Sequence, residues 1–247
     1  MGLKAEKLYW EQIKNNKSLK LKYIKYMKIL VIAPHPDDEV LGCGGTIKKY
    51  TDAGAEVYLC IVTKNFSPDW TDELQKEREE EIENVRKILG IKKVFFLNLP
   101  NTKLDTIPQK EINDAILKCI KEVKAEVLYI PYNGDVHKDH RLIFEAAMVA
   151  ARPKVGYTVK KILCYEVISE TDWAFHHFKD VFSPNVYVDV SKTLDEKIRA
   201  MSCYKMELYK EYYSFTTDDI RFLAKKRGFD AGIDLAEAFV LLRDIEG

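Results

Sequence analysis

The amino-acid sequence predicts an α/β protein: a three-layer, Rossmann-like, mostly parallel sheet with helices on both faces. From Met27 onward, short apolar runs alternate with longer stretches that carry apolar residues at helical spacing, and glycines such as Gly54 and Gly90 separate them. Strands that alternate with helices form parallel sheets, because each helix crosses back over the sheet to the next strand. The 247 residues are enough for one large domain of this kind.

Each expected element rests on a local pattern. Runs rich in β-branched and aromatic residues predict strands at 28–33, 56–63, 93–98, 126–132, 161–168 and 186–190. Amphipathic stretches predict helices at 44–53, 72–89, 109–124, 140–151, 191–210 and 217–228. Thr71 or Asp72 is expected to cap the second helix, which Gly90 ends, and Ser191 is expected to cap the fifth.

We expect a single domain over residues 27–247, preceded by an N-terminal arm of residues 1–26. The apolar run after Met27 is a natural start for a first strand, and the lysine-rich segment before it has only a loose helical pattern. A solvated helix packed on the domain is the favoured interpretation of the arm, because basic runs are usually solvated faces. A subunit contact or a site for an anionic partner is the alternative.

Composition excludes several classes of function. Lysine plus arginine and aspartate plus glutamate both number 39, so the formal net charge is zero and nucleic acid is not an expected partner. No apolar run approaches the ~20 residues of a membrane-spanning helix, and the N-terminus lacks the pattern of a secretory signal. The five cysteines form no CxxC pair, which is typical of buried thiols, so a cytoplasmic location is expected.

The densest cluster of reactive side chains follows the first expected strand, in the sequence HPDDE at 35–39. His35 and Asp38 are three residues apart, so one turn can bring an imidazole and a carboxylate, two ligand types that zinc takes, to one point. Asp37 lies between them and is free for another role. Three glycines follow at 42, 44 and 45, but the third glycine of a GxGxxG nucleotide motif is absent, which favours close backbone approach at the crevice instead.

A second cluster follows the expected strand at 126–132, in the sequence NGDVHKDHR at 133–141. His137 and His140 flank Asp139 there, so three of the five histidines of the chain lie in two short clusters. The carboxyl ends of parallel strands meet at one edge of a sheet, where α/β proteins bind ligands. The two clusters therefore predict one site.

HPDDE, with HKDH about a hundred residues later, resembles the motif pair of the zinc-dependent de-N-acetylases of the LmbE/PIG-L family. The resemblance implies a Zn²⁺ ion held by His35, Asp38 and His140, with another divalent metal such as Fe²⁺ possible in its place. It implies that Asp37 is the general base. His137 would stabilise the oxyanion as an imidazolium or protonate the leaving amine, and Asp139 would hold an imidazole in its tautomer.

Simpler structural roles are the alternatives for these residues. His35 and His140 could hydrogen-bond at strand ends without binding a metal. Asp37 could serve as an N-cap, and Asp139 could be a carboxylate favoured by a helix dipole. The clustering of the set favours the ligand interpretation.

The same resemblance implies that Arg78 and Asn101 bind the substrate. Arg78 would match an arginine of the family's RxxE stretch, with Glu81 at the acidic position, although the sequence alone favours a charge on a solvated helix. Asn101 stands in Leu-Pro-Asn-Thr, where similar proteins often carry Leu-Pro-Asp-Gly, and Asp105 is the nearest substitute carboxylate.

The expected function is removal of an acetyl group from the nitrogen of an N-acetylated amino sugar or sugar conjugate, by attack of a metal-activated water. A homo-oligomer is expected. One alternative is a metal-dependent phosphoesterase, but two metals would require Asp37, Asp38 and Asp139 as ligands and leave no base. The other alternative is a non-catalytic sugar-binding protein, which the replacement of a carboxylate by Asn101 keeps open.

Overall fold

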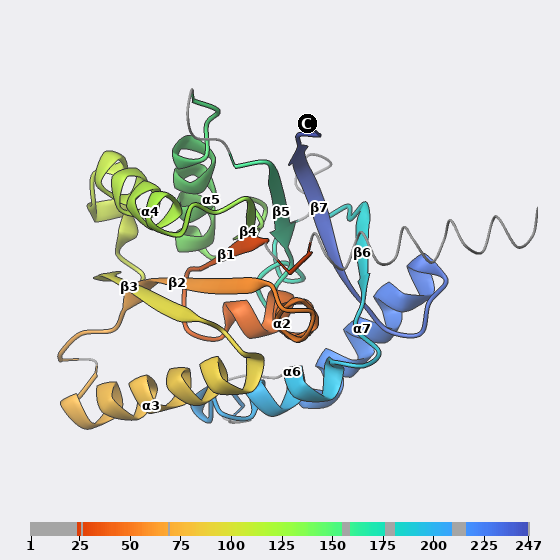
Figure 1. The fold of residues 1–247 in the computed structure, drawn as a ribbon. Helices are drawn as coiled ribbons and strands as arrows, with labels where there is room; N and C mark the ends of the chain where they lie inside the picture. The colour runs from red at the N-terminus through yellow and green to blue at the C-terminus, as the bar shows by residue number, and fades with distance from the viewer. Residues whose placement is uncertain are drawn as a thin grey trace, which may run out of the picture.

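The computed structural model describes residues 24–25, 27–68, 70–154, 159–175, 181–208 and 216–246. Apart from residues 24 and 25, the predicted N-terminal arm lies outside these ranges, so the arm and the single-domain organisation stay predictions. The described residues form a seven-stranded sheet in the order β3-β2-β1-β4-β5-β7-β6 (Figure 1). The strands are β1 (Lys28–Ala33), β2 (Glu56–Lys64), β3 (Lys93–Pro100), β4 (Val127–Pro131), β5 (Lys161–Tyr165), β6 (Val186–Asp189) and β7 (Ala236–Asp244).

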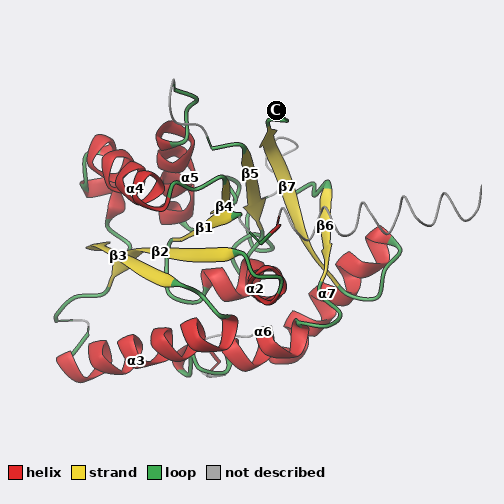
Figure 2. Ribbon diagram, viewed as in Figure 1, coloured by secondary structure: helices red, strands yellow, loops and turns green. Residues whose placement is uncertain are grey.

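Helices cover both faces of this sheet (Figure 2). They are α2 (Asp38–Asp52), α3 (Asp72–Leu89), α4 (Gln109–Val123), α5 (Lys138–Ala150), α6 (Leu194–Met201) and α7 (Thr217–Ala231), with short 3₁₀ turns η1 (Leu104–Thr106) and η2 (Met206–Leu208). Helices α4 and α5 lie on one face, and α2, α3 and α6 lie on the other (Figures 1 and 2). The predicted three-layer, mostly parallel α/β fold is confirmed. None of the described helices has the length and apolar character needed to cross a membrane.

The sheet contains a topological switch point between β1 and β4. Strands β3, β2, β1, β4 and β5 run parallel, whereas β7 pairs antiparallel with both β5 and β6. The chain moves outward from β1 to β3 and then returns to the other side of β1 to form β4. A crevice opens at the carboxyl ends of such a strand pair. The two polar clusters follow β1 and β4, so both lie at this crevice.

Alternation along β1 explains the two apolar cores. Ile29, Val31 and Ala33 contribute to the core under α2 and α3, whereas Leu30 and Ile32 contribute to the core under α4 and α5. A central parallel strand is buried on both faces, which is why β1 reads as a continuous apolar run.

The predicted limits of α3 are confirmed by its caps. The Thr71 hydroxyl accepts a hydrogen bond from the backbone N–H of Leu74 at 3.3 Å. Gly90 ends the helix in the left-handed conformation, with φ of 73°, which glycine adopts without strain. Between these caps, Ile82 and Val85 pack into the core.

Several expected elements need correction. Helix α2 begins at Asp38 instead of residue 44, and it contains a non-helical residue, Cys43. Helix α6 ends at Met201, far short of residue 210, and the residue before it is Thr193. Ser191 does not cap α6, because its hydroxyl and N–H donate to Asp189. Strand β7 was not predicted from the sequence.

The glycine run of α2 permits close packing. A Cβ atom on Gly42 would lie 2.2 Å from Cδ2 of Tyr165, and one on Gly45 would lie 2.9 Å from Cγ1 of Val190. The glycines therefore allow close packing, but against the side chains of Tyr165 and Val190 and not at the crevice where it was expected.

A buried ion pair closes the break in α2. The Glu237 carboxylate accepts hydrogen bonds from the backbone N–H groups of Gly45 at 2.9 Å and Thr46 at 2.7 Å. The Lys197 ammonium donates to the carbonyl of Leu41 and to Glu237, both at 2.7 Å. These two side chains satisfy backbone groups that lose their helical partners at Cys43, because a helix end otherwise leaves them unpaired.

Candidate metal centre and active site

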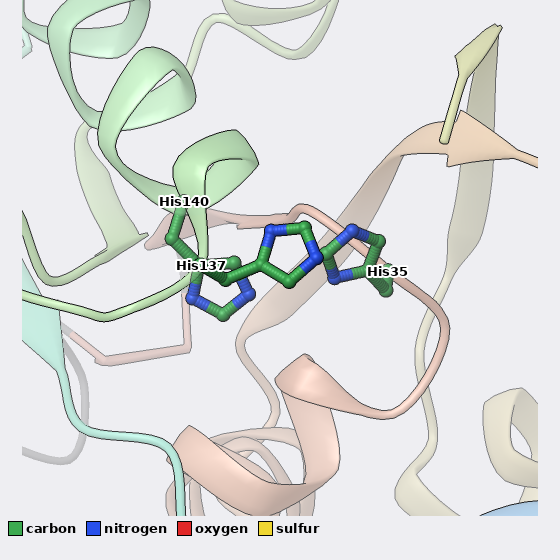
Figure 3. Close-up of side chains that lie close together, drawn as sticks. All are labelled: His35, His137 and His140. Carbon is green, nitrogen blue, oxygen red and sulfur yellow. The ribbon is translucent and has the colours of Figure 1, made fainter. Parts of the chain in front are cut away.

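The structure brings the two polar clusters together (Figure 3). His35 comes from the loop after β1, whereas His137 and His140 lie at the start of α5 (Figure 3). The ring of His35 lies 4.5 Å from that of His137 and 5.3 Å from that of His140, measured between centroids. One nitrogen from each ring lies within 4.8 Å of the others, so the three residues could hold a metal ion.

Asp38 lies between two of these histidines. Its Oδ2 atom is 3.3 Å from Nδ1 of His35 and 3.3 Å from Nε2 of His140, and it accepts the backbone N–H of His35 at 2.8 Å. Burial alone would raise the pKa of Asp38, but His140 and His35 lower it below its usual range. The carboxylate therefore stays ionised beside two imidazole nitrogens.

The remaining ring nitrogens of His35 and His140 each face a carboxylate. Nε2 of His35 lies 3.3 Å from Oδ2 of Asp139, and Nδ1 of His140 lies 2.8 Å from Oδ2 of Asp135. The hydroxyl of Thr171 donates to the other oxygen of Asp135 at 2.6 Å. Histidines that bind metals usually donate their second N–H to such a partner.

Sequence reasoning missed the role of Asp135. This residue is 1% exposed and lies five positions before His140, inside the stretch quoted for the second cluster. The only available signal was that proximity, because its contact with Thr171 joins segments that are distant in sequence.

The surroundings of Nε2 of His140 indicate whether these residues fit a metal ion. His140 is fully buried, and its Nε2 atom lies 3.3 Å from Oδ2 of Asp38 without forming a well-aligned hydrogen bond among the described residues. A buried polar atom whose hydrogen bond is poorly formed costs free energy. A cation between His35, Asp38 and His140 would satisfy it, and two imidazoles with one carboxylate form a donor set that zinc accepts.

His137 differs from the other two histidines. Its Nδ1 atom accepts a hydrogen bond from the backbone N–H of Asp139 at 3.1 Å and so caps α5. Nδ1 therefore carries no proton, and the neutral ring carries its proton on Nε2. Burial, followed by the charges of His35 and His140, lowers the pKa of His137 to about 4. The structure thus favours a neutral ring over the imidazolium expected from the sequence.

Asp37 has a strained backbone. Its φ of 136° is unusual for a residue other than glycine, and such strain occurs mostly at functional sites. The N–H of Asp37 donates to Glu39 at 3.1 Å, and the hydroxyl of Tyr204 donates to the other oxygen of Glu39 at 2.6 Å. Asp37 occupies the N-cap position of α2, as the structural alternative expected, but its carboxylate makes no capping hydrogen bond. Burial, followed by the charge of Asp38, raises the pKa of Asp37 well above its usual range.

Asp139 connects His35 to a third loop. Besides facing Nε2 of His35, its Oδ2 atom accepts the backbone N–H of Thr102 at 2.8 Å. Thr102 lies in the loop after β3, directly after Asn101. The imidazole that Asp139 contacts is thus that of His35.

Arg78 is buried at 8% exposure, so the alternative of a solvated charge is wrong. Its guanidinium lies 5.4 Å from the ring centroid of Trp70 and 5.3 Å from that of Tyr204. It pairs with Glu207 at 2.6 Å and with Glu81 at 3.5 Å. These contacts hold the guanidinium rigidly in the wall of the site.

A cavity of about 460 Å³ lies over the cluster, within the range typical of small-molecule sites. Its lining includes His35, Asp37, Asp38, Arg78, Asn101 and His137. The amide of Asn101 donates to the side chain of Asn65 at 2.6 Å. Asp105, the nearest substitute carboxylate, pairs instead with Lys138 at 2.8 Å.

Comparisons with known proteins agree with this site. The family model described as GlcNAc-PI de-N-acetylase (PIG-L) matches residues 30–151. The chain is 30% identical over 226 residues to the diacetylchitobiose deacetylase of Thermococcus kodakarensis, covering 85% of this chain and 81% of that protein. The chain belongs to the PIG-L family of de-N-acetylases.

The chain is also similar to other deacetylases, in sequence and in fold. A probable N-acetyl-α-D-glucosaminyl L-malate deacetylase 2 of Bacillus anthracis is 26% identical, with 80% of this chain and 92% of that protein covered. The solved N,N′-diacetylchitobiose deacetylase of Pyrococcus horikoshii superposes with a TM-score of 0.70 at 23% identity, covering 87% of this chain and 83% of that one. The second match extends the shared fold beyond the residues of the family model.

Proposed function

We propose that this PIG-L protein is a zinc-dependent hydrolase that removes the acetyl group from the nitrogen of an N-acetylated amino sugar or its conjugate. The observation that carries the proposal is the convergence of Nε2 of His140 and Nδ1 of His35 on Oδ2 of Asp38, each at 3.3 Å, with no well-formed hydrogen bond to the buried Nε2 of His140. The relatives named as deacetylases of N-acetylated sugars support the substrate class.

The proposed zinc ligands are His35, Asp38 and His140. The carboxylate partners of His35 and His140 favour this set, because each would leave the facing nitrogen free to bind. His137 is the weaker candidate, because its accepting Nδ1 places the ring proton on Nε2, the nitrogen that remains for a ligand.

Zinc held there would lower the pKa of a water molecule and polarise the acetyl carbonyl. Asp37 is proposed to accept a proton as the water oxygen bonds to the carbonyl carbon, and to return it to the nitrogen as the C–N bond breaks. The N–H of His137 would donate to the carbonyl oxygen as negative charge develops there. Acetate and a free amine are the products.

Further proposals concern the state of the protein. We propose a homo-oligomer, supported by the large aromatic side chains in the loop after β5 at Trp173 and Phe175, which are 61% and 86% exposed. A cytoplasmic location is supported by the free cysteines, four of which are buried as thiols.

The function is tested by acetate release from a panel of N-acetyl amino sugars, free and conjugated, with zinc-loaded protein. Asp37→Ala serves as the blank, and the zinc content of both proteins is measured. Acetate from the wild type and none from the blank, at equal zinc content, is expected. Zinc binding without acetate from any panel member would contradict the proposal.

A further inference from the structure

A second cavity lies beside the site, between α3 and the edge strand β3. Its volume is about 610 Å³. Because alternate residues of a strand face opposite sides, Val94, Phe96 and Asn98 share the face of β3 that points toward α3. Phe96 is 47% exposed there, so α3 covers this face only in part. We call this cavity the α3–β3 groove.

The groove adjoins the cavity over the histidine cluster, with which it shares part of its wall. Residues that line both cavities are Pro36, Asn65, Trp70, Arg78 and Asn101. A ligand whose reacting group lies at His35 and Asp38 can therefore extend past Trp70 into the groove. Arg78, which pairs with Glu207 and lies over Trp70, stands where the two spaces adjoin.

The uncharged part of the groove wall suits a sugar ring. Trp70 and Phe96 supply aromatic surfaces, and Gln75, Asn98 and Asn101 supply amides. Aromatic faces pack against the C–H groups of a sugar, whereas amides offer both donors and acceptors to its hydroxyls.

The charged residues of the groove are paired. Four cations in the wall each lie against a carboxylate: Lys64 with Glu79, Arg86 with Glu83, Lys92 with Glu56 and Lys93 with Glu122. Arg78 pairs with Glu207. An anionic ligand would have to displace these partners, so the charge balance favours an uncharged, hydroxyl-rich occupant.

From these observations we propose that the α3–β3 groove binds a second, uncharged sugar residue of the substrate. The enzyme would then prefer N-acetylated disaccharides or longer chains to the monosaccharide. This inference rests on the proposed function, because the first sugar must place its acetamide at the histidine cluster.

The test compares kcat/KM for N-acetylglucosamine and N,N′-diacetylchitobiose in the zinc-loaded wild type, Phe96→Ala and Phe229→Ala. Phe229 is a matched control, because it is an exposed phenylalanine on α7 outside the groove. The wild type is expected to prefer the disaccharide about tenfold or more, and Phe96→Ala is expected to lose about five- to tenfold of this preference through KM. Phe229→Ala should keep the full preference, and both variants should hydrolyse the monosaccharide normally.

Four results would count against these proposals. Equal rates on both sugars, or a preference that Phe96→Ala leaves unchanged, would refute the groove proposal alone. No acetate from either sugar, or from any other member of the panel, would refute the proposed function, and calorimetric titration with diacetylchitobiose would then decide the groove. Binding that weakens in Phe96→Ala would support the groove, and no binding would refute it.

Discussion

At the scale of single residues, the three histidines of the site differ in their hydrogen-bond partners. His35 and His140 each have a carboxylate on one ring nitrogen and face Asp38 with the other. His137 instead accepts a backbone N–H with Nδ1. The hydrogen-bond partner of each imidazole therefore indicates its role: His35 and His140 are candidates for metal ligands, and His137 is a candidate for a hydrogen-bond donor.

We predict that His137→Ala lowers kcat by about 100- to 1,000-fold without loss of zinc, since one donor to the oxyanion disappears. His137→Gln should retain more activity than the alanine variant, because an amide can also donate a neutral N–H. Kinetics and metal analysis of both variants check this. Equal activity in the two variants would argue against a neutral donor.

Asp135→Ala is predicted to weaken zinc affinity by about 10- to 100-fold, because His140 loses the partner that orients it. Asp135→Asn should weaken it less, since an amide oxygen still accepts the N–H. Competition with a chromogenic chelator measures the affinity, and circular dichroism verifies folding. Asp105→Ala, at an aspartate that pairs only with exposed Lys138, is the control. Unchanged affinity in Asp135→Ala would remove Asp135 from the metal centre.

At the scale of elements, α2 places the reactive carboxylates and depends on distant segments to do so. Its first turn carries Asp38 and Glu39, and its break at Cys43 is bridged by Glu237 from β7 and Lys197 from α6. The helix that starts the site is therefore fixed by the last third of the chain.

Glu237→Ala is predicted to destabilise the protein by about 3–5 kcal/mol, because it leaves the buried ammonium of Lys197 without its carboxylate and two backbone N–H groups without an acceptor. The double variant Glu237→Gln with Lys197→Met should be less affected, since no unpaired charge remains. Denaturant unfolding measures both. The exposed pair of Lys110 and Asp114 gives the control, because Asp114→Ala should change stability far less. A small loss in Glu237→Ala would show that the break needs no such support.

Local patterns predicted much of the fold but not these long-range contacts. The apolar run of β1 and the caps Thr71 and Gly90 of α3 are local signals, and the structure confirms the elements that they define. The glycine-rich first half of α2 was not predicted as helix, because contacts with Tyr165 and Glu237 stabilise it. Each of these contacts spans more than a hundred residues.

In the candidate site, too, the local motifs predicted the position of the residues but not their contacts. The motif pair placed His35, Asp38 and His140 at one crevice, because β1 and β4 are neighbours that end at the same edge. Which carboxylate contacts which imidazole depends on side-chain direction, and spacing does not encode it. The sequence alone therefore made Arg78 look solvated, although Trp70 and Tyr204 enclose it.

At the scale of the whole molecule, the site joins two halves of the sheet. His35 and Asp38 follow β1, and His140 begins α5 after β4, so one ion would bridge both sides of the switch point. A ligand that binds only the folded protein stabilises it by mass action.

We predict that saturating zinc raises the Tm of the wild type by roughly 10 °C over the chelator-treated protein. His137→Ala should keep this shift, whereas His140→Ala should lose it. Differential scanning fluorimetry with and without a chelator checks both. Loss of the shift in His137→Ala would indicate that the metal uses the three histidines instead of Asp38.

The hydrogen bond from the backbone N–H of Thr102 to Asp139 connects the loop after β3 to the candidate metal centre. The same carboxylate oxygen contacts the metal-ligand candidate His35 and the loop that carries Asn101, a residue expected to bind the substrate. A substrate that orders this loop therefore also orders His35. Such coupling is reciprocal, so we expect zinc to tighten sugar binding by the same factor by which sugar tightens zinc binding.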